Sequence, residues 1–510
     1  MAGRCVFWSG RLSLLVAVGV FALAPGRVDP SHAQARQSLH GSLVQVFTTS
    51  NPPDQFAPWR RTGPDSSSGS GVIISGRRVL TAAHVVADQV MVEVRRAGEG
   101  HSYTAEVTHV CHPCDLALLT IPDPAFFKGS EALEIGELPA LQQAVEIHGF
   151  PVGGSGLAIT SGIVSRIAVD YYVHSLTRLL LVQVDAAVNS GNSGGPALSD
   201  GKVVGIAMQT LDDAENVGYI VPAPIIRHFL DDVEDGRFDG FPELGFRVQL
   251  LRSSALRARL GLERVEGGIL VTAVSTSGCA HGILEPGDVV LAFDGIPIDF
   301  GGSVALGDGV RVDATFLEQR AQVGEELEVT FLREGVEQKH KIRMKLPNPL
   351  IPVGDYDRGP SYRIYAGLVF QPLTLRYLET FDDPPSRLMF YYDNPAAGGH
   401  RLLVPDRGIP GRRQVIILSR VLTTEFTRGY QSMEDEVVLA VDGTTVRDLR
   451  HLSELLEGAS GKFVTIATES GELIALDRKA VTAASGEILA RYQIASDRSA
   501  DLQVPASMGR

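Results

Sequence analysis

The chain has 510 residues, more than one hydrophobic core accommodates, and this length indicates three or four domains. Its hydrophobic fraction of 44% and charged fraction of 21% are typical of folded proteins, and its net charge is −14. The acidic balance and the lack of a long basic run argue against nucleic acid and anionic lipid as main partners. The 54 glycines favour strands joined by turns over long helices.

Residues 1–35 have the pattern of a secretory signal peptide. Arg4 and Arg11 accompany an apolar run at residues 12–24, which is short for a membrane span of about 20 residues. Ala-Gln-Ala at residues 33–35 fits the small-x-small cleavage pattern. A cleaved signal predicts a periplasmic or secreted protein without a stable membrane span. The alternative is an uncleaved anchor.

Short apolar runs at β spacing follow, interrupted by glycine, aspartate and proline. The first group predicts strands at residues 42–47, 71–74, 79–80, 90–94, 103–110 and 116–121. The second group predicts strands at residues 145–148, 162–167, 179–184, 202–207 and 219–221, and a closing helix at 224–231. Residues 51–70, rich in Pro, Ser and Gly, predict a surface loop.

Three motifs in this half carry candidate catalytic residues. His84 lies in Thr-Ala-Ala-His-Val, Asp115 begins Asp-Leu-Ala-Leu-Leu, and Ser193 lies in Gly-Asn-Ser-Gly-Gly-Pro. A serine hydroxyl needs an adjacent base to become a nucleophile, and a carboxylate orients that base. Glycines let consecutive N–H groups converge on an oxyanion. Taken singly, the three residues would be a packed histidine, a strand-end cap and an ordinary turn.

Together the motifs resemble the HtrA/Deg serine proteases, with the His, Asp, Ser order of the chymotrypsin class. The resemblance implies a mainly β fold of two six-stranded antiparallel barrels, over residues 36–238. His84 and Asp115 would come from the first barrel and Ser193 from the second. Ser193 would be the nucleophile, His84 the general base and Asp115 its orienting carboxylate. The N–H groups of Gly191 and Ser193 would form the oxyanion hole.

The first specificity pocket is predicted to be apolar. In this class its base lies six residues before the nucleophile, at Ala187, and Ile206 and Met208 are expected on its wall. None of them is a carboxylate that would select Lys or Arg. We therefore expect cleavage after small or medium apolar residues. Residues 210–216 match a regulatory loop of the family, or form a solvated turn.

Cys111 and Cys114 form a CxxC motif directly before Asp115. Three interpretations are open: a redox-sensitive disulfide, half of a metal site, or two loop thiols. A second CxxC or a ligand-spaced histidine pair is missing from the sequence, which disfavours zinc. Without a metal or organic cofactor motif, we expect no cofactor.

From about Phe241 the sequence changes character. Leu244-Gly245-Phe246, followed by apolar runs at 268–271 and 287–295, resembles a PDZ domain, here assigned to residues 239–348. In such a domain the N–H groups of Leu244, Gly245 and Phe246 would hold the terminal carboxylate of a peptide. The peptide would add to the sheet edge as a strand.

Residues 435–443 repeat residues 287–295 at an offset of 148 and share Val-Val-Leu-Ala-x-Asp-Gly. The repeat predicts a second PDZ-like α+β module at residues 349–486. The stretch at 360–374 resembles the plant-type branch of Deg proteases, where this module tends towards an assembly role. Residues 487–510 are polar and predict an extended tail.

The sequence thus predicts a secreted, ATP-independent serine endopeptidase that degrades unfolded or damaged proteins in quality control. Its first PDZ module would bind C-terminal peptides, and no nucleic acid is expected. The family implies a homo-oligomer, a trimer or a multiple of it; Phe56 and Trp59 are candidates for that contact or for packing on the first barrel. The alternatives are a non-catalytic holdase or PDZ scaffold, and a processing protease with one dedicated substrate.

Overall fold

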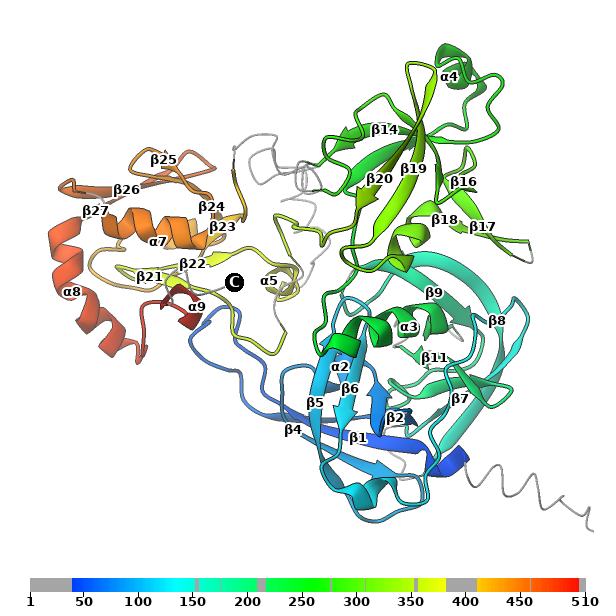
Figure 1. Ribbon diagram of the computed structural model, residues 1–510. Coiled ribbons are helices and arrows are strands. Elements are labelled where there is room, and N and C mark those ends of the chain that lie inside the picture. Colours follow the sequence, from blue (N-terminus) through cyan, green and yellow to red (C-terminus); the bar gives the residue numbers. More distant parts are fainter. Residues whose placement is uncertain are drawn as a thin grey trace, which may run out of the picture.

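A computed structural model describes residues 39–151, 156–175, 177–208, 217–275, 278–307, 309–352, 356–381, 411–458 and 460–503. Figure 1 shows two β-barrels and two smaller sheet modules along the chain. Within these ranges, none of the helices is both long and apolar enough to span a membrane. The predicted signal peptide at 1–35 and the predicted regulatory loop at 210–216 lie outside the described residues.

The first barrel closes in the strand order β1-β2-β3-β6-β5-β4, with all neighbours antiparallel. Its elements are β1 (Leu43–Ser50), β2 (Asp65–Ile74), β3 (Arg78–Thr81), α2 (Ala83–Val86), β4 (Gln89–Arg96), β5 (Tyr103–Cys111), β6 (Leu116–Thr120) and η1 (Pro124–Phe127). Alternate apolar side chains fill the interior, among them the fully buried Val44 and Leu119. The predicted loop at 51–70 is too long, because its last six residues extend β2.

The second barrel closes in the order β10-β11-β12-β9-β8-β7. Its elements are β7 (Ala144–Gly149), β8 (Ala158–Tyr171), β9 (Arg178–Val184), β10 (Pro196–Ser199), β11 (Lys202–Ala207), β12 (Gly218–Pro222), α3 (Ala223–Asp232) and η2 (Val233–Asp235). The predicted fold of two six-stranded antiparallel barrels is confirmed. The predicted closing helix is α3, which buries Ile225, Ile226 and Phe229 in the shared core.

The first module after the barrels, which the sequence predicts to be a PDZ domain, is a sheet in the order β13-β14-β15-β19-β20. Its elements are β13 (Phe246–Leu250), α4 (Ser254–Arg259), β14 (Ile269–Val274), β15 (Val289–Phe293), β16 (Ile296–Pro297), β17 (Ser303–Gly307), β18 (Val310–Asp313), η3 (Ala314–Arg320), β19 (Glu326–Arg333) and β20 (Val336–Arg343). Strand β13 lies at one end of the sheet and pairs with β14 alone in the described part of the chain. The edge of β13 that faces away from β14 is therefore open to an added strand.

The second module is a sheet in the order β21-β22-β23-β24-β26-β27. Its elements are β21 (Arg363–Tyr365), β22 (Leu368–Pro372), α5 (Leu375–Leu378), β23 (Ile416–Val421), η5 (Gln431–Met433), β24 (Glu436–Val441), β25 (Thr444–Thr445), α7 (Leu449–Gly458), β26 (Phe463–Thr468), β27 (Leu473–Asp477), α8 (Arg478–Arg491) and α9 (Ala500–Gln503).

The sequence repeat corresponds to one hairpin in each module. Strand β15 pairs with β16, and β24 pairs with β25, each across an Asp-Gly turn. Asp294 and Asp442 have φ of 45° and 48°, and the glycines that follow have φ of 73° and 77°. Two consecutive residues with positive φ match the tight hairpin turns that Asp-Gly favours.

The end of the chain differs from the predicted extended tail. Helix α8 continues to Arg491, Ile494 is 5% exposed, and Arg498 bridges to Arg363 in β21. The amide of Ile364 donates to the carbonyl of Asp497 at 2.7 Å. The prediction rested on polar composition, which does not show that the backbone of Asp497 and Arg498 pairs with β21 of the second module.

The second module is docked against the first barrel. Asp88, 4% exposed, forms an ion pair with Arg376 at 2.8 Å, and the amide of Asp357 donates to its carboxylate at 2.9 Å. Phe56 packs on Tyr377 with ring centroids 5.7 Å apart. Trp59 similarly packs on Tyr362. Both aromatic candidates for a trimer contact therefore lie against the second module of their own chain, and oligomerisation stays a prediction.

We predict that Arg376→Ala loosens this docking, because it leaves the buried Asp88 carboxylate without its cation. Breaking a buried pair costs about 3 kcal/mol, or about 100-fold in an opening equilibrium. Hydrogen exchange of the Asp88 and Asp357 amides, followed by mass spectrometry, measures the change. Arg491→Ala is the control, since its pair with Glu487 is exposed. Equal exchange in both variants would contradict the prediction.

Candidate active site

His84 and Asp115 lie side by side on the first barrel, because His84 follows β3, Asp115 precedes β6, and these two strands are paired. The His84 ring nitrogen Nδ1 lies 2.8 Å from Oδ2 and 3.0 Å from Oδ1 of Asp115. The backbone N–H of His84 also donates to Asp115 Oδ1 at 2.9 Å. This arrangement places the proton on Nδ1 and leaves Nε2 free to accept one. The carboxylate therefore fixes both the tautomer and the orientation of the imidazole.

The protonation states of the two side chains depend on each other. Burial lowers the pKa of His84, but the charge and hydrogen bond of Asp115 outweigh it and raise the pKa above its ordinary value. Burial similarly opposes ionisation of Asp115, yet its contacts with His84 lower the pKa of the carboxyl. Asp115 thus stays ionised and stabilises the imidazolium form of its partner.

A short disulfide-closed turn sets the position of Asp115. Cys111 and Cys114 are bonded, both are fully buried, and the amide of Asp115 donates to the carbonyl of His112 at 3.2 Å. Asp115 itself has φ of 52°, in the left-handed region that Asp tolerates better than most residues. Of the three interpretations of the CxxC motif, the structure shows the disulfide. In the described ranges, no cluster of ligand side chains suits a metal ion.

The Ser193 loop is held by its own backbone bonds. The amide of Gly195 donates to the carbonyl of Asn192 at 2.9 Å, and that of Gly194 donates to Ala207 at 2.9 Å. Gly194 needs glycine for two reasons: its φ is 82°, and a Cβ there would lie 2.3 Å from Thr81 Oγ1. This close approach brings the loop against the segment that leads to His84.

Ser70 in β2 joins the two barrels at this loop. Its Oγ donates to the carbonyl of Gly191 at 2.6 Å and accepts from the amide of Phe150 at 2.9 Å. Its amide donates to the carbonyl of Ser193 at 2.8 Å. An added Cβ on the neighbouring Gly69 would meet both Ser193 and the side chain of Val85, the residue after His84. The candidate nucleophile and base are thus brought to one place from different barrels.

Two backbone N–H groups of the loop are available for a ligand. Those of Gly191 and Ser193 donate to no acceptor among the described residues, whereas the N–H of Asn192 donates to Asn189. Gly191 has φ of 95°, a conformation that glycine adopts readily. Unused, neighbouring N–H groups beside a serine are what an oxyanion hole requires.

The three residues expected at the specificity pocket lie close to this loop in the second barrel. Ile206 and Met208 are buried, and the amide of Met208 donates to Tyr219 at 2.9 Å. Ala187 is half-buried, and its carbonyl accepts from Thr160 Oγ1 at 2.9 Å. These three side chains carry no charge.

The predicted carboxylate-binding loop of the first module is only partly free. The N–H of Leu244 donates to Glu318 at 2.8 Å, and burial raises the pKa of Glu318 to about 8. The N–H of Gly245 has no acceptor among the described residues. Phe246 begins β13, whose exposed Val248 and Leu250 flank the open edge.

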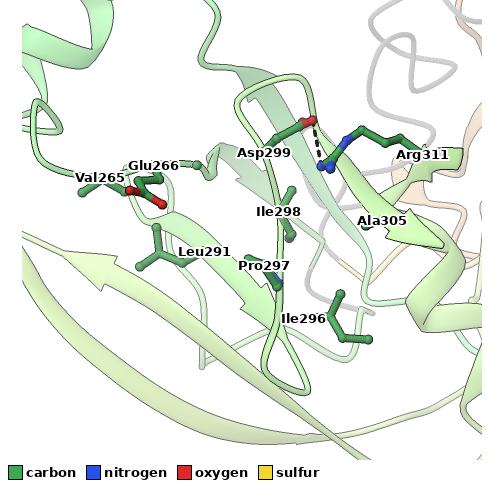
Figure 2. A pocket seen from close by; sticks show the side chains of 10 residues that line it. Val265, Glu266, Leu291, Ile296, Pro297, Ile298, Asp299, Ala305 and Arg311 are labelled. Carbon is green, nitrogen blue, oxygen red and sulfur yellow. Dashed lines mark ion pairs between the residues drawn. The ribbon is translucent and has the colours of Figure 1, made fainter. Parts of the chain in front are cut away.

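A pocket in the same module, shown in Figure 2, lies apart from the candidate catalytic residues. An ion pair between Asp299 and Arg311, 2.9 Å long, closes one side. The lining residues are Val265, Glu266, Gly267, Leu291, Ile296, Pro297, Ile298, Asp299, Ala305 and Arg311. Its lining includes no serine, cysteine or histidine.

Comparisons with known proteins indicate the family of this chain. A family model described as trypsin-like peptidase domain matches residues 69–206, and a PDZ domain model matches residues 351–501. Protease Do-like 2, chloroplastic, of Arabidopsis thaliana is 35% identical over 486 residues, covering 94% of this chain and 78% of the relative. Protease Do-like 4, mitochondrial, of the same plant is 34% identical over 489 residues, covering 96% and 90%.

This chain belongs to the HtrA/Deg family of serine proteases. It is a serine endopeptidase with trypsin-like and PDZ domains. Among solved structures, an HtrA-type protease AlgW with a tripeptide is similar at 26% identity and a TM-score of 0.48, over 63% of this chain and 98% of that one.

Sequence motifs did not reveal every residue that contacts this site. Ser70 lies in a Ser/Gly-rich run whose composition predicts a loop, so the sequence showed no sign of its contacts with the Ser193 loop. His174 and Tyr356, which pack near His84, lie in segments without a recognisable motif. Contacts between such distant segments have no local pattern that a sequence could display.

We predict that Ser70→Ala impairs catalysis more than folding. The change leaves the Phe150 amide without an acceptor and frees the carbonyl of Gly191, at a cost of about 1–3 kcal/mol. If this free energy is lost from the stability of the active conformation of the Ser193 loop, kcat/KM falls by about tenfold or more. Ser66→Ala is the control, because Ser66 lies exposed in the same strand. Equal activity of both variants on a peptide substrate would contradict this role.

Proposed function

We propose that Ser193, His84 and Asp115 form the catalytic triad of this endopeptidase. The observation that carries the proposal is the His84–Asp115 contact, which puts the proton on Nδ1 and leaves Nε2 unprotonated, as a general base requires. Ser70 and Gly194 hold the Ser193 loop against the segment before His84. This is the arrangement that nucleophilic catalysis by serine needs.

The proposed reaction has two halves. Ser193 Oγ attacks the scissile carbonyl while His84 Nε2 takes its proton, and the N–H groups of Gly191 and Ser193 bind the oxyanion. His84 then protonates the leaving amine, which leaves an acyl-enzyme. Water, activated by His84, hydrolyses the acyl-enzyme and restores Ser193. Asp115 stabilises the imidazolium in both halves without becoming protonated.

We further propose cleavage after small or medium apolar residues. The uncharged side chains of Ala187, Ile206 and Met208 support this preference, since none would attract Lys or Arg. Apolar pockets discriminate by only about 1–3 kcal/mol per methylene. Such weak discrimination suits unfolded or damaged proteins, whose apolar residues are exposed at many places. Quality control without ATP is therefore the proposed role.

The first PDZ-like module would bind peptide C-termini at the open edge of β13. Its free Gly245 N–H and the exposed Val248 and Leu250 support this proposal. Leu244 would contribute its N–H after Glu318 releases it. Assembly into trimers or larger oligomers is part of the proposal and rests on family resemblance.

We place the mature protein outside the cytosol. The support is the signal-like pattern at residues 1–35, which predicts a periplasmic or secreted protein. Two relatives carry the names chloroplastic and mitochondrial, which likewise denote compartments other than the cytosol.

Digestion of an unfolded casein-like protein, with mass spectrometry of the products, tests the proposed function. We expect many cuts after Val, Ala, Ile or Leu from the native chain and none from Ser193→Ala. Residual cutting by that variant would refute Ser193 as nucleophile. Suppressed aggregation without cutting by either protein would favour a holdase, and one or very few cuts would favour a processing protease.

The pH dependence tests the proposed base. Because Asp115 favours the imidazolium, the pKa of His84 lies above the ordinary value of about 6.5. Only neutral His84 accepts the proton, so kcat/KM rises with pH through this pKa and is lost below it. Asp115→Asn should move this rising, acidic limb of the pH–rate profile to lower pH and reduce kcat by about 10⁴-fold.

Glu146→Gln is the matched control, because this exposed carboxylate pairs with His148 instead. Its pH–rate profile for peptide hydrolysis should follow that of the native chain. An Asp115→Asn profile with the native limb and native kcat would refute the assignment of Asp115.

A further inference from the structure

Three aromatic side chains from distant segments pack together beside His84. His174, in the turn between β8 and β9, has its ring centroid 6.0 Å from that of His84. His112 lies inside the disulfide-closed turn, and Tyr356 precedes β21 in the second module. The ring of Tyr356 is 4.2 Å from that of His112 and 4.4 Å from that of His174.

Tyr356 holds His174 at two points. Its hydroxyl donates to the backbone carbonyl of His174 at 2.8 Å, and its ring contacts the imidazole. His112 adds a third contact, since its Nδ1 lies 3.0 Å from Nε2 of His174. Both the backbone and the ring of His174, the neighbour of His84, are therefore held by contacts with other segments.

The position of Tyr356 depends in turn on docking of the second module. The guanidinium of Arg376 lies 4.2 Å over the ring of Tyr356 and pairs with Asp88 of the first barrel. Asp357, the next residue, lies 3.1 Å from Nε2 of His112. The contacts that dock the second module on the first barrel therefore also hold Tyr356 next to His174, the neighbour of His84.

We propose that Tyr356 is a positioning residue for His84 that acts through His174, so that docking of the second module completes the active site. The inference rests on the proposed role of His84 as base. An error of about 1 Å in the position of a catalytic group can reduce a rate about 100-fold. A neighbour that restrains the imidazole therefore has a measurable effect on turnover without touching the substrate.

The charge of His174 agrees with this role. Burial lowers its pKa to about 4, so at neutral pH the ring is uncharged. An uncharged neighbour adds no repulsion against the imidazolium that His84 forms during the reaction. The groups whose charges influence the pKa of His174 are Asp115, His84, His112 and Arg376. Of these, Asp115 alone favours a charged His174.

The test compares Tyr356→Ala and Tyr356→Phe with the native full-length chain on a peptide substrate. We expect Tyr356→Ala to lower kcat about tenfold with KM within twofold, because orientation rather than binding is lost. Tyr356→Phe keeps the stacked ring and loses the hydroxyl, so we expect an intermediate kcat. If Tyr356→Ala does not fold, the kcat of Tyr356→Phe still tests the inference.

Tyr362→Ala is the matched control, since this tyrosine contacts Trp59 across the same interface and, among the described residues, contacts neither His84 nor His174. We expect its kcat to stay within twofold. Equal kcat for native, Tyr356→Ala and Tyr356→Phe would overturn the inference, and so would a rise, which would mean that the segment covers the site. If Ser193→Ala or His84→Ala retained native activity, the proposed function itself would fail, whatever Tyr356 did.

Discussion

The hydrogen bond between His84 Nδ1 and Asp115 is the interaction on which the rest of this site depends. It decides which ring nitrogen carries the proton, and therefore which one can accept a proton from a serine. Burial alone would disfavour the charged form of either residue, whereas the pair stabilises both. The disulfide-closed turn and the left-handed backbone of Asp115 serve this contact, because they set where the carboxylate lies.

At the site the two barrels are joined by hydrogen bonds of Ser70 and by a close backbone approach, in addition to the apolar core that they share. Ser70 donates two hydrogen bonds to the Ser193 loop, and Gly194 lets that loop approach Thr81 more closely than any other residue would allow. The second module adds a further contact through Tyr356 and Arg376. Elements separated by more than a hundred residues thus restrain one imidazole and one loop.

Sequence predicted those parts of the molecule that have a local pattern. Apolar runs at β spacing located the barrel strands except β10, the shared Val-Val-Leu-Ala-x-Asp-Gly located the repeat, and three motifs selected His84, Asp115 and Ser193 as candidates. It missed Ser70, because a Ser/Gly-rich run has the composition of a loop whether or not it pairs as a strand. It also missed the packed segment after Arg491 and the contact of Tyr356 with His174, since tertiary contacts across long separations leave no periodicity in the chain.

Labelling with a fluorophosphonate tests the central claim most directly, because this reagent reacts with a serine that an adjacent base activates. The adduct would be located by mass spectrometry of peptides from the native chain and from His84→Ala. The account predicts one adduct, on Ser193, in the native chain and none in the variant. Labelling of another serine, or equal labelling of Ser193 without His84, would contradict it.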